Sequence, residues 1–421
     1  MNDKKIMDTI IRSVLKKINP NKKVIKEAEL FVQSLNNKFN EKKIKATAIL
    51  GGSIAKDTFL KNDYDIDVFV RFDYSYKEKN ISDILESVLP KKSERVHGSR
   101  DYFQLRNGKL NFEIVPVLFV TDYKKALNVT DMSPLHVEWV KERIKKNEKL
   151  REEIRLLKQF CKAVGVYGAE SYIKGLSGHV IDILVIYYGS FLAALRAVSN
   201  WKDITIIDPE KHLRDPLREL NKSKLQSPLI IVDPVQKNRN ASAAVSKEKY
   251  EKFIKCAKDF MNNPSEDFFT VKSLDIKELK ILKKASKNYF VIIDVYTYKN
   301  KKDIMGTRFM QVYDKLLNTL KVNNFNVVKS DWYFNKDLNN SIMYFEIKNE
   351  KLSKTIMWRG PPLKEKDDYK RFVKKYDDII IQDKRVYAKI KRTYMEPIAL
   401  VKDVLNSDYI KEKITRSKII Y

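Results

Sequence analysis

The first 120 residues pass from one hydrophobic pattern to another. Over 4–18 and again over 24–38, apolar residues recur every three or four positions, which predicts two amphipathic helices broken at Asn19-Pro20. From 46 to 120, short apolar runs alternate with helical patterns. This alternation predicts a small mixed sheet.

The rest of the chain is helical at first and mixed later. Helical periodicity dominates from 134 to about 200, and after a Pro-rich polar passage a helix is predicted at 246–261. Asn262-Asn263-Pro264-Ser265 is the clearest linker signal. Beyond it the patterns predict a strand at 289–295, a helix at 308–320 and a strand at 341–347. The last segment, 365–421, is basic and is expected to alternate Lys-rich helix with one more strand at 378–389. The β-α-β order indicates a ferredoxin-like or RNA-recognition-like module.

Candidate chemistry appears in the predicted sheet. A Gly51-Gly52-Ser53 turn precedes an apolar strand that carries Asp65 and Asp67. Side chains alternate along a strand, so these two carboxylates point to the same face. Carboxylates held together in apolar surroundings favour a hard divalent cation such as Mg²⁺, and a Gly-rich turn offers backbone N–H groups to a phosphate. The combination predicts nucleotidyl transfer.

A third acid is expected nearby. Asn107-Gly108 is a strong hairpin signal, and Glu113 lies in the apolar strand that follows it. If this strand pairs beside the strand of Asp65 and Asp67, three carboxylates converge. They could then hold two metal ions roughly 3.5–4 Å apart.

Several later segments resemble one family, the class I (archaeal-type) CCA-adding enzymes, which are tRNA nucleotidyltransferases of the polymerase-β-like superfamily. The Gly-Ser turn and the Asp-x-Asp pair are common to the whole superfamily. The more specific matches keep the family's order and approximate spacing from about residue 45 to 260. They are Asp131-Met132-Ser133-Pro134-Leu135-His136, Arg155-Leu156-Leu157-Lys158-Gln159-Phe160, Gly165-Val166-Tyr167-Gly168-Ala169-Glu170, Ser177-Gly178, Tyr188-Gly189-Ser190-Phe191, Val232-Asp233-Pro234-Val235 and Arg239-Asn240-Ala241.

The resemblance implies a role for nine residues. Asp65, Asp67 and Glu113 match the catalytic, metal-binding carboxylates. The matches to nucleotide-binding residues are Ser53, Lys56, His136, Lys158, Tyr167 and Arg239. Two positions depart from the family, which usually has Asp where this chain has Glu113 and often Arg where it has Lys56.

The residues alone do not select every one of these positions. The residues alone favour an ordinary histidine at a helix N-terminus for His136, and Arg239 is compatible with a solvated loop charge. Lys158 is one of many lysines in a basic helix, and Tyr167 fits a core aromatic position. The resemblance singles out all four.

Composition agrees with a nucleic-acid partner. The chain has 83 Lys and Arg against 55 Asp and Glu, a formal net charge of +28. Residues 271–421 hold 34 basic and 19 acidic residues, a net of +15, so the C-terminal third is the more cationic part. Such an excess favours binding to a polyanion. A lysine-rich bias of the whole proteome is an alternative source for part of it.

The remaining features indicate a cytoplasmic protein. Cys161 and Cys256 lack metal-type spacing and fit a reducing compartment. The charged N-terminus has no apolar signal-peptide region. The uncharged stretch 183–195 is too short to span a bilayer and is expected to be a buried core helix, so no membrane partner is expected.

The sequence therefore predicts a multidomain α+β protein. The expected parts are a polymerase-β-like nucleotidyltransferase head (1–140), a helical central domain that completes the nucleotide pocket (141–262), a ferredoxin- or RRM-like body (263–355) and a basic tRNA-binding tail (356–421). The resemblance implies an enzyme that adds CCA to the 3′ end of tRNA without a template. It would use CTP, ATP and Mg²⁺ and release pyrophosphate. The oligomeric state stays open, with a homodimer as one candidate.

Two alternatives remain. One is a poly(A)-polymerase-like or A-only RNA nucleotidyltransferase, because nucleotide choice does not follow from these residues. The other is an RNA-binding protein on a degenerate nucleotidyltransferase fold. The presence of carboxylates at all three acidic positions argues against the second. Antibiotic nucleotidyltransferases are disfavoured by the basic C-terminal third.

Overall fold

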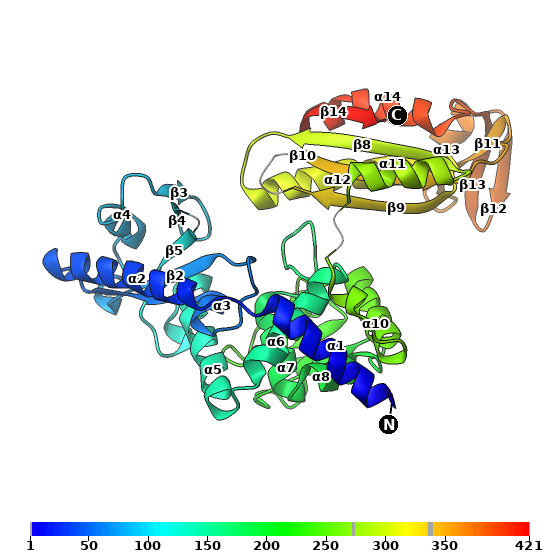
Figure 1. Cartoon of the computed structure of the whole chain (residues 1–421). Helices are drawn as coiled ribbons and strands as arrows, with labels where there is room; N and C mark the ends of the chain where they lie inside the picture. Colours follow the sequence, from blue (N-terminus) through cyan, green and yellow to red (C-terminus); the bar gives the residue numbers. More distant parts are fainter. Residues whose placement is uncertain (1, 109, 272–273, 336–339, 421) are drawn as a thin grey trace. The chain divides into compact units, whose positions relative to one another are not determined.

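Two folding units make up the chain, with the division at residues 271/272 (Figure 1). The computed structural model describes residues 2–108, 110–271, 274–335 and 340–420. Each unit has its own sheets and helices, and the two are described separately below.

The first unit contains a five-stranded mixed sheet. Its strand order is β1-β2-β5-β4-β3, where β2 and β5 are parallel and the other neighbours are antiparallel. The strands are β1 (Ala46–Leu50), β2 (Ile66–Phe72), β3 (Glu94–Val96), β4 (Tyr102–Asn107) and β5 (Leu110–Leu118). The predicted mixed sheet is confirmed. The predicted hairpin turn lies between β4 and β5, where Gly108 has φ +60°.

Two helices share a hydrophobic core with this sheet. The apolar face of α2 (Lys23–Glu41) includes Leu35 and Phe39, which pack in one cluster with Val68 and Phe72 of β2. The short helix α4 (Ile81–Glu86) adds Leu85. We call the sheet with α2 and α4 the head.

The remaining helices of the first unit form a second core, which we call the helical part. Its helices are α1 (Asn2–Ile18), α5 (Ser133–Lys146), α6 (Leu150–Ala163), α7 (Gly178–Tyr188), α8 (Phe191–Val198) and α10 (Lys247–Asn262). Phe160 of α6 lies at its centre, with ring centroids 6.0 Å from Phe191 and 5.7 Å from Phe260. The first helix was expected in the head, but α1 packs in this second core through Val14 and Ile18 (Figure 1).

The uncharged stretch 183–195 differs from the single helix expected there. It is divided between α7 and α8, because Gly189 adopts the left-handed φ of +87° that ends α7. The Ser190 side chain then accepts a hydrogen bond from the Ala193 N–H and begins α8.

Short elements connect these helices and strands. They are α3 (Gly52–Ala55), η1 (Tyr74–Tyr76), η2 (Tyr123–Lys125), η3 (Val129–Met132), β6 (Thr205–Ile207), α9 (Pro216–Glu219), η4 (Lys222–Lys224), β7 (Leu229–Ile231) and η5 (Glu266–Phe269). The strands β6 and β7 form a small parallel pair. The segment after the expected linker at 262–265 packs in the helical core, because η5 contributes Phe269 to it.

The second unit is built on a four-stranded antiparallel sheet. Its order is β14-β8-β10-β9, from β8 (Tyr289–Thr297), β9 (Val327–Phe334), β10 (Asn340–Ile347) and β14 (Ile414–Ile420). A helix connects β8 to β9, and β10 lies between these two strands, which is the split βαβ arrangement of ferredoxin-like folds. The predicted body fold is confirmed.

Helices cover both faces of this sheet. On one face α12 (Lys302–Val322) stacks Tyr313 on Phe345 with ring centroids 5.4 Å apart, and α14 (Pro397–Asn406) packs beside α12. On the other face Leu279 of α11 (Ile276–Ala285) packs with Tyr344. Between β10 and α14 the chain forms a three-stranded sheet with one helix: β11 (Thr355–Pro362), α13 (Lys366–Lys375), β12 (Ile379–Gln382) and β13 (Arg385–Lys391). The short helix α15 (Asp408–Lys411) follows α14.

The segment expected as a basic tail returns to the body. Its last strand, β14, pairs with β8 and forms one edge of the four-stranded sheet. The single strand expected over 378–389 is a hairpin, because Asp383 and Lys384 have φ of +48° and +58° and turn the chain between β12 and β13.

Candidate active site

Two carboxylates lie side by side in the head's sheet. The parallel register of β2 and β5 pairs Asp67 with Glu113. On the other side of β5, Gln104 is the register partner of Glu113 and donates from its amide nitrogen to Glu113 Oε1 at 3.0 Å. Asp65 directly precedes β2 and is exposed. The structure therefore brings together the two strands that carry the three predicted acids.

The glycine turn packs directly on Asp67. The Gly51 N–H donates to the Asp67 carbonyl at 2.7 Å, and Gly52 has φ +52°. A Cβ at Gly52 would lie 1.7 Å from Asp67 Oδ2. Only glycine fits here, because both the backbone angle and the space exclude a side chain. Ser53 follows in α3, half-buried, and its carbonyl accepts from the Thr58 N–H at 2.9 Å.

The electrostatics of the acid cluster suit a cation. Burial and, after it, the charges of Glu113 and Asp65 together raise the pKa of Asp67 to about 7, although Lys56 and Lys158 oppose the shift. The cluster is therefore short of positive charge. A divalent cation with a preference for oxygen ligands would supply it, so these three residues fit such an ion.

Lys56 reaches from the turn to the helical part. Its ammonium pairs with Asp182 of α7, and both side chains are nearly excluded from solvent. Asp182 was not predicted as a site residue. The signal in the sequence was a lone acid directly before the longest uncharged stretch.

A row of cations on α6 binds the segment that follows the turn. Arg151, Arg155, Lys158 and Lys162 are spaced to share one helix face. Arg151 and Arg155 contact Asp57, Lys158 donates to the Thr58 carbonyl at 2.8 Å, and Lys162 pairs with Asp63. Burial lowers the pKa of Lys158 to about 7, although the charge of Asp182 opposes the shift.

A second cluster contains His136 and Arg239. The His136 Nε2 lies 3.0 Å from both carboxylate oxygens of Asp233, and Arg239 donates to Asp233 Oδ2 at 2.7 Å. His179 of α7 stands beside His136, with ring centroids 4.4 Å apart. Ligand atoms of His136, His179 and Asp233 all lie within 4.8 Å of one another. Sequence reasoning named neither His179 nor Asp233 as a site residue.

Tyr167 stands next to the N-terminus of α7. Burial raises the pKa of its phenol, with Asp182 adding to the shift, and the Lys162 ammonium lies 4.7 Å from its ring centroid. A Cβ at Gly178 would lie 3.3 Å from the Tyr167 hydroxyl.

The charge of Lys56 acts on both Asp67 and His179, which links the carboxylates electrostatically to the second cluster.

Three family models together match most of the chain. They are a nucleotidyltransferase domain over 32–159, the second domain of tRNA nucleotidyltransferase over 152–270, and the C-terminal domain of CCA-adding enzymes over 288–416. The CCA-adding enzyme of Methanocaldococcus jannaschii is 32% identical over 418 residues, which cover 96% of this chain and 91% of that protein. The CCA-adding enzyme of Nanoarchaeum equitans is 35% identical over 355 residues, which cover 82% of this chain and 84% of that protein.

The chain belongs to the CCA-adding enzyme family. The expected resemblance is thus confirmed over both units. Among solved structures, the Cid1 poly(U) polymerase with Mg and 3′-dATP bound aligns with a TM-score of 0.52 and 13% identity, covering 63% of this chain and 98% of that one. This likeness shows a shared fold. The nucleotidyltransferase head is confirmed by the family model over 32–159.

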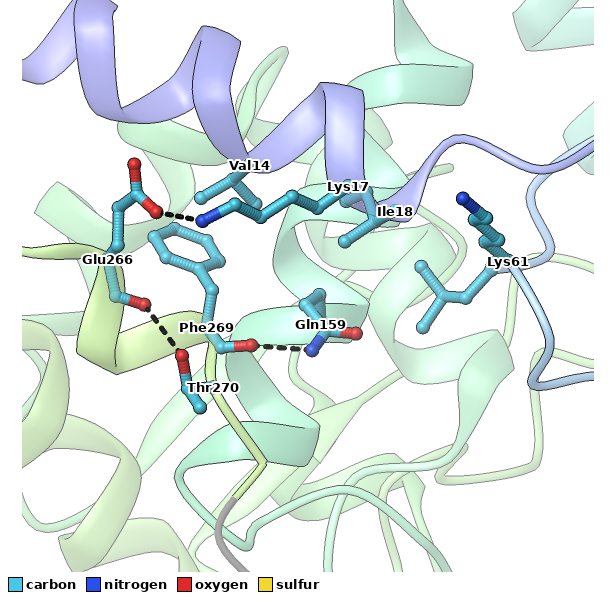
Figure 2. Close-up of a pocket in the computed structure, with 9 residues that line it drawn as sticks. Val14, Lys17, Ile18, Lys61, Gln159, Glu266, Phe269 and Thr270 are labelled. Atoms are coloured by element: carbon cyan, nitrogen blue, oxygen red, sulfur yellow. Dashed lines mark hydrogen bonds and ion pairs between the residues drawn. The ribbon is translucent and has the colours of Figure 1, made fainter.

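A separate cavity in the first unit is not lined by Asp65, Asp67 or Glu113 (Figure 2). It has a volume of about 220 Å³ and is lined by α1, α6 and η5 with the segment at Leu60 and Lys61. Lys17 pairs with Glu266 at its edge, and Gln159 donates to the Phe269 carbonyl at 2.6 Å. These contacts join η5 to α1 and α6, so we interpret the cavity as a packing gap and not as the active site.

Two apolar helices, α7 and α8, follow each other in the described part of the chain. No one helix there has the length and apolar composition to cross a bilayer, and α7 and α8 meet the criterion only as a pair bent by 97°.

Proposed function

We propose that this chain adds C, C and A to the 3′ end of tRNA without a template, using CTP and ATP and releasing pyrophosphate. The family membership over nearly the whole chain supports the reaction. The observation that carries the site is the pairing of Asp67 with Glu113 under the Gly52 turn, with Asp65 two residues away.

Asp65, Asp67 and Glu113 are proposed to hold Mg²⁺. Bound metal would lower the pKa of the tRNA 3′-hydroxyl and neutralise charge on the triphosphate. Glu113 replaces the family's usual Asp, and its longer side chain is oriented by the hydrogen bond from Gln104. Because Gly52 has no side chain, the turn can lie directly against Asp67.

The other six candidate residues are proposed to bind the nucleotide. Ser53 and Lys56 would contact the triphosphate from the turn. Lys158 of α6, whose pKa is about 7, would be protonated beside the bound triphosphate. Asp182 holds the Lys56 ammonium at the boundary of the head and the helical part. His136, Tyr167 and Arg239 would contact the nucleoside.

The remaining expectations are part of the same proposal. The basic C-terminal third would bind tRNA, the protein would act in the cytoplasm without a membrane partner, and a homodimer is a candidate assembly. The four-part division at 140, 262 and 355 stays a prediction. A poly(A)-polymerase-like enzyme and a catalytically inactive RNA-binding protein remain the alternatives to be tested.

One extension assay separates these possibilities. The protein is incubated with Mg²⁺, CTP, ATP and a tRNA that ends at its discriminator base, and the products are resolved by length. We expect three added nucleotides, and loss of extension in Asp67→Asn and Glu113→Gln. A ladder of A residues would support the poly(A)-polymerase-like alternative. Unchanged extension in both variants would refute the carboxylate assignment.

A further inference from the structure

Asp233 is a buried carboxylate whose two oxygens are both engaged. It follows β7, its side chain is fully buried, and the backbone N–H groups of Val235 and Gln236 donate to Oδ1 at 2.9 and 3.1 Å. Arg239 donates to Oδ2, and His136 contacts both oxygens. The carboxylate therefore binds its own loop and two candidate nucleotide-binding side chains at once.

The two side chains come from distant parts of the sequence. His136 lies on α5, 97 positions before Asp233, while Arg239 lies on the same loop as Asp233. The Arg239 side chain is 44% exposed although the Asp233 side chain is fully buried, so one guanidinium nitrogen is anchored while the side chain as a whole stays accessible to a ligand. An Arg has five N–H donors, and the contact with Asp233 uses one terminal nitrogen. Anchoring of this kind reduces the entropy lost when the side chain binds a base or phosphate.

Asp233 is held ionised by its surroundings. Burial alone would raise its pKa, but the hydrogen bond from His136 and the charges of His136, His179 and Arg239 lower the pKa well below the ordinary range. The same carboxylate could be read as a metal ligand together with His136 and His179. Four protein N–H or ring nitrogen groups already surround its oxygens, so the contacts favour an anchoring role over a vacant metal site.

We propose that Asp233 is a positioning residue for nucleotide selection, which fixes Arg239 and His136 in the geometry that accepts CTP and ATP. The proposal rests on the proposed function, because it assigns both partners to the nucleotide pocket. Asp233 itself has no contact with the nucleotide in this scheme and acts through the two side chains.

The test compares two buried carboxylates of similar surroundings. Asp131 pairs with Arg100 and accepts from the backbone N–H groups of Leu118, Leu127 and Asn128, but it lies outside the proposed pocket. Asp233→Asn keeps an oxygen for the Val235 and Gln236 N–H groups, so the loop can retain its turn. Asp131→Asn is the matched control for loss of a buried charge.

We expect Asp233→Asn to raise KM for CTP and ATP by about tenfold or more and to increase misincorporation of UTP and GTP, with a smaller change in kcat. Asp131→Asn should lower thermal stability and leave nucleotide selectivity unchanged. In an Arg239→Ala background, Asp233→Asn should cause less additional loss than it does alone. The proposal would be overturned if Asp233→Asn kept the nucleotide selectivity of the wild type, or if its effect on KM were fully additive with that of Arg239→Ala. It would also be overturned if Asp233→Asn and Asp131→Asn changed KM and selectivity in the same way.

A second readout keeps this test separate from the proposed function. Direct binding of CTP and ATP in the presence of Mg²⁺, measured by calorimetry without tRNA, should be weakened in Asp233→Asn and not in Asp131→Asn. If the wild type binds both nucleotides but does not extend tRNA, the proposed function fails while the binding comparison still decides the role of Asp233. Equal affinity in the wild type and Asp233→Asn would overturn that role.

Discussion

Asp67 and Glu113 are direct register partners across the parallel strands β2 and β5. The two carboxylates are adjacent only because β5 returns beside β2 after the β4–β5 hairpin. Their mutual repulsion adds to the effect of burial on Asp67, whose pKa is raised to about 7. In the metal-free protein this pair lowers the free energy of unfolding, as is common for charged groups held together at ligand-binding sites.

Asp67→Asn should stabilise the metal-free protein at pH 8 while abolishing nucleotide addition. The pKa of Asp67 is about 7 when folded against an ordinary 3.8, so stability from this group is present at low pH and is lost as the pH rises from about 4 to 7. We expect the variant to raise Tm at pH 8 by about 3 °C or more, with a smaller gain at pH 5. Asp65→Asn, at an exposed position, is the control. An equal drop in Tm for Asp67→Asn at both pH values would contradict this assignment.

The requirement for Mg²⁺ should depend on pH. Below about pH 7 a proton competes with the metal for Asp67, so the apparent affinity for Mg²⁺ should fall about tenfold for each further pH unit. Extension rates measured against Mg²⁺ concentration at pH 6, 7 and 8 give the apparent constants. A constant Mg²⁺ requirement over this range would show that Asp67 is not a ligand that must lose a proton.

Gly52→Ala should lower the activity by more than the loss of stability from backbone strain accounts for. The added Cβ would lie 1.7 Å from Asp67 Oδ2, so the turn or the carboxylate must move. Gly108→Ala is a matched control, because Gly108 also has positive φ but a Cβ there would meet nothing within 4 Å. Both variants should lose about 1 kcal/mol of stability from strain. Only Gly52→Ala should lower kcat/KM, by about a hundredfold or more. Similar activities for the two variants would argue against the turn as part of the site.

The buried Lys56–Asp182 pair should behave as a coupled unit. Asp182→Leu leaves Lys56 and the nearby Lys158 without their buried counter-charge, and we expect a loss of about 3–5 kcal/mol in the free energy of unfolding. The double variant Lys56→Met, Asp182→Leu should recover most of that stability but not the activity, since Lys56 is assigned to the triphosphate. Denaturant unfolding and extension assays on Lys56→Met, Asp182→Leu and the double variant measure the coupling. Recovery of activity in the double variant would exclude a role for Lys56 in nucleotide binding.

Local patterns predicted the elements that form the acidic edge of the site. The Asn107-Gly108 turn and the apolar strand around Glu113 are visible in the sequence, and the observed β4–β5 hairpin follows from them. The amphipathic pattern of 4–18 predicted a helix but not its partner, because a hydrophobic stripe does not specify which core it joins. The edge strand β9 was not predicted, since half of its residues are exposed and its apolar run is interrupted by Lys329, Ser330 and Asp331.

Contacts between distant segments limited the prediction of the pocket. Asp182 is recognised as a site residue only because α7 brings it to Lys56. Asp233 is recognised only because the loop after β7 brings it to His136 and Arg239. Likewise, β14 completes the sheet beside β8, from which it is separated by most of the second unit. No local pattern encodes such pairings.

The identity of the added nucleotides tests the central claim most directly. A tRNA ending at the discriminator base is incubated with the wild-type protein, Mg²⁺ and either CTP alone or CTP with ATP, and the 3′ ends are sequenced. We predict that CTP alone gives two added C residues and that both nucleotides give CCA, with no further addition. A homopolymer of A, or an unextended tRNA under both conditions, would contradict the assignment.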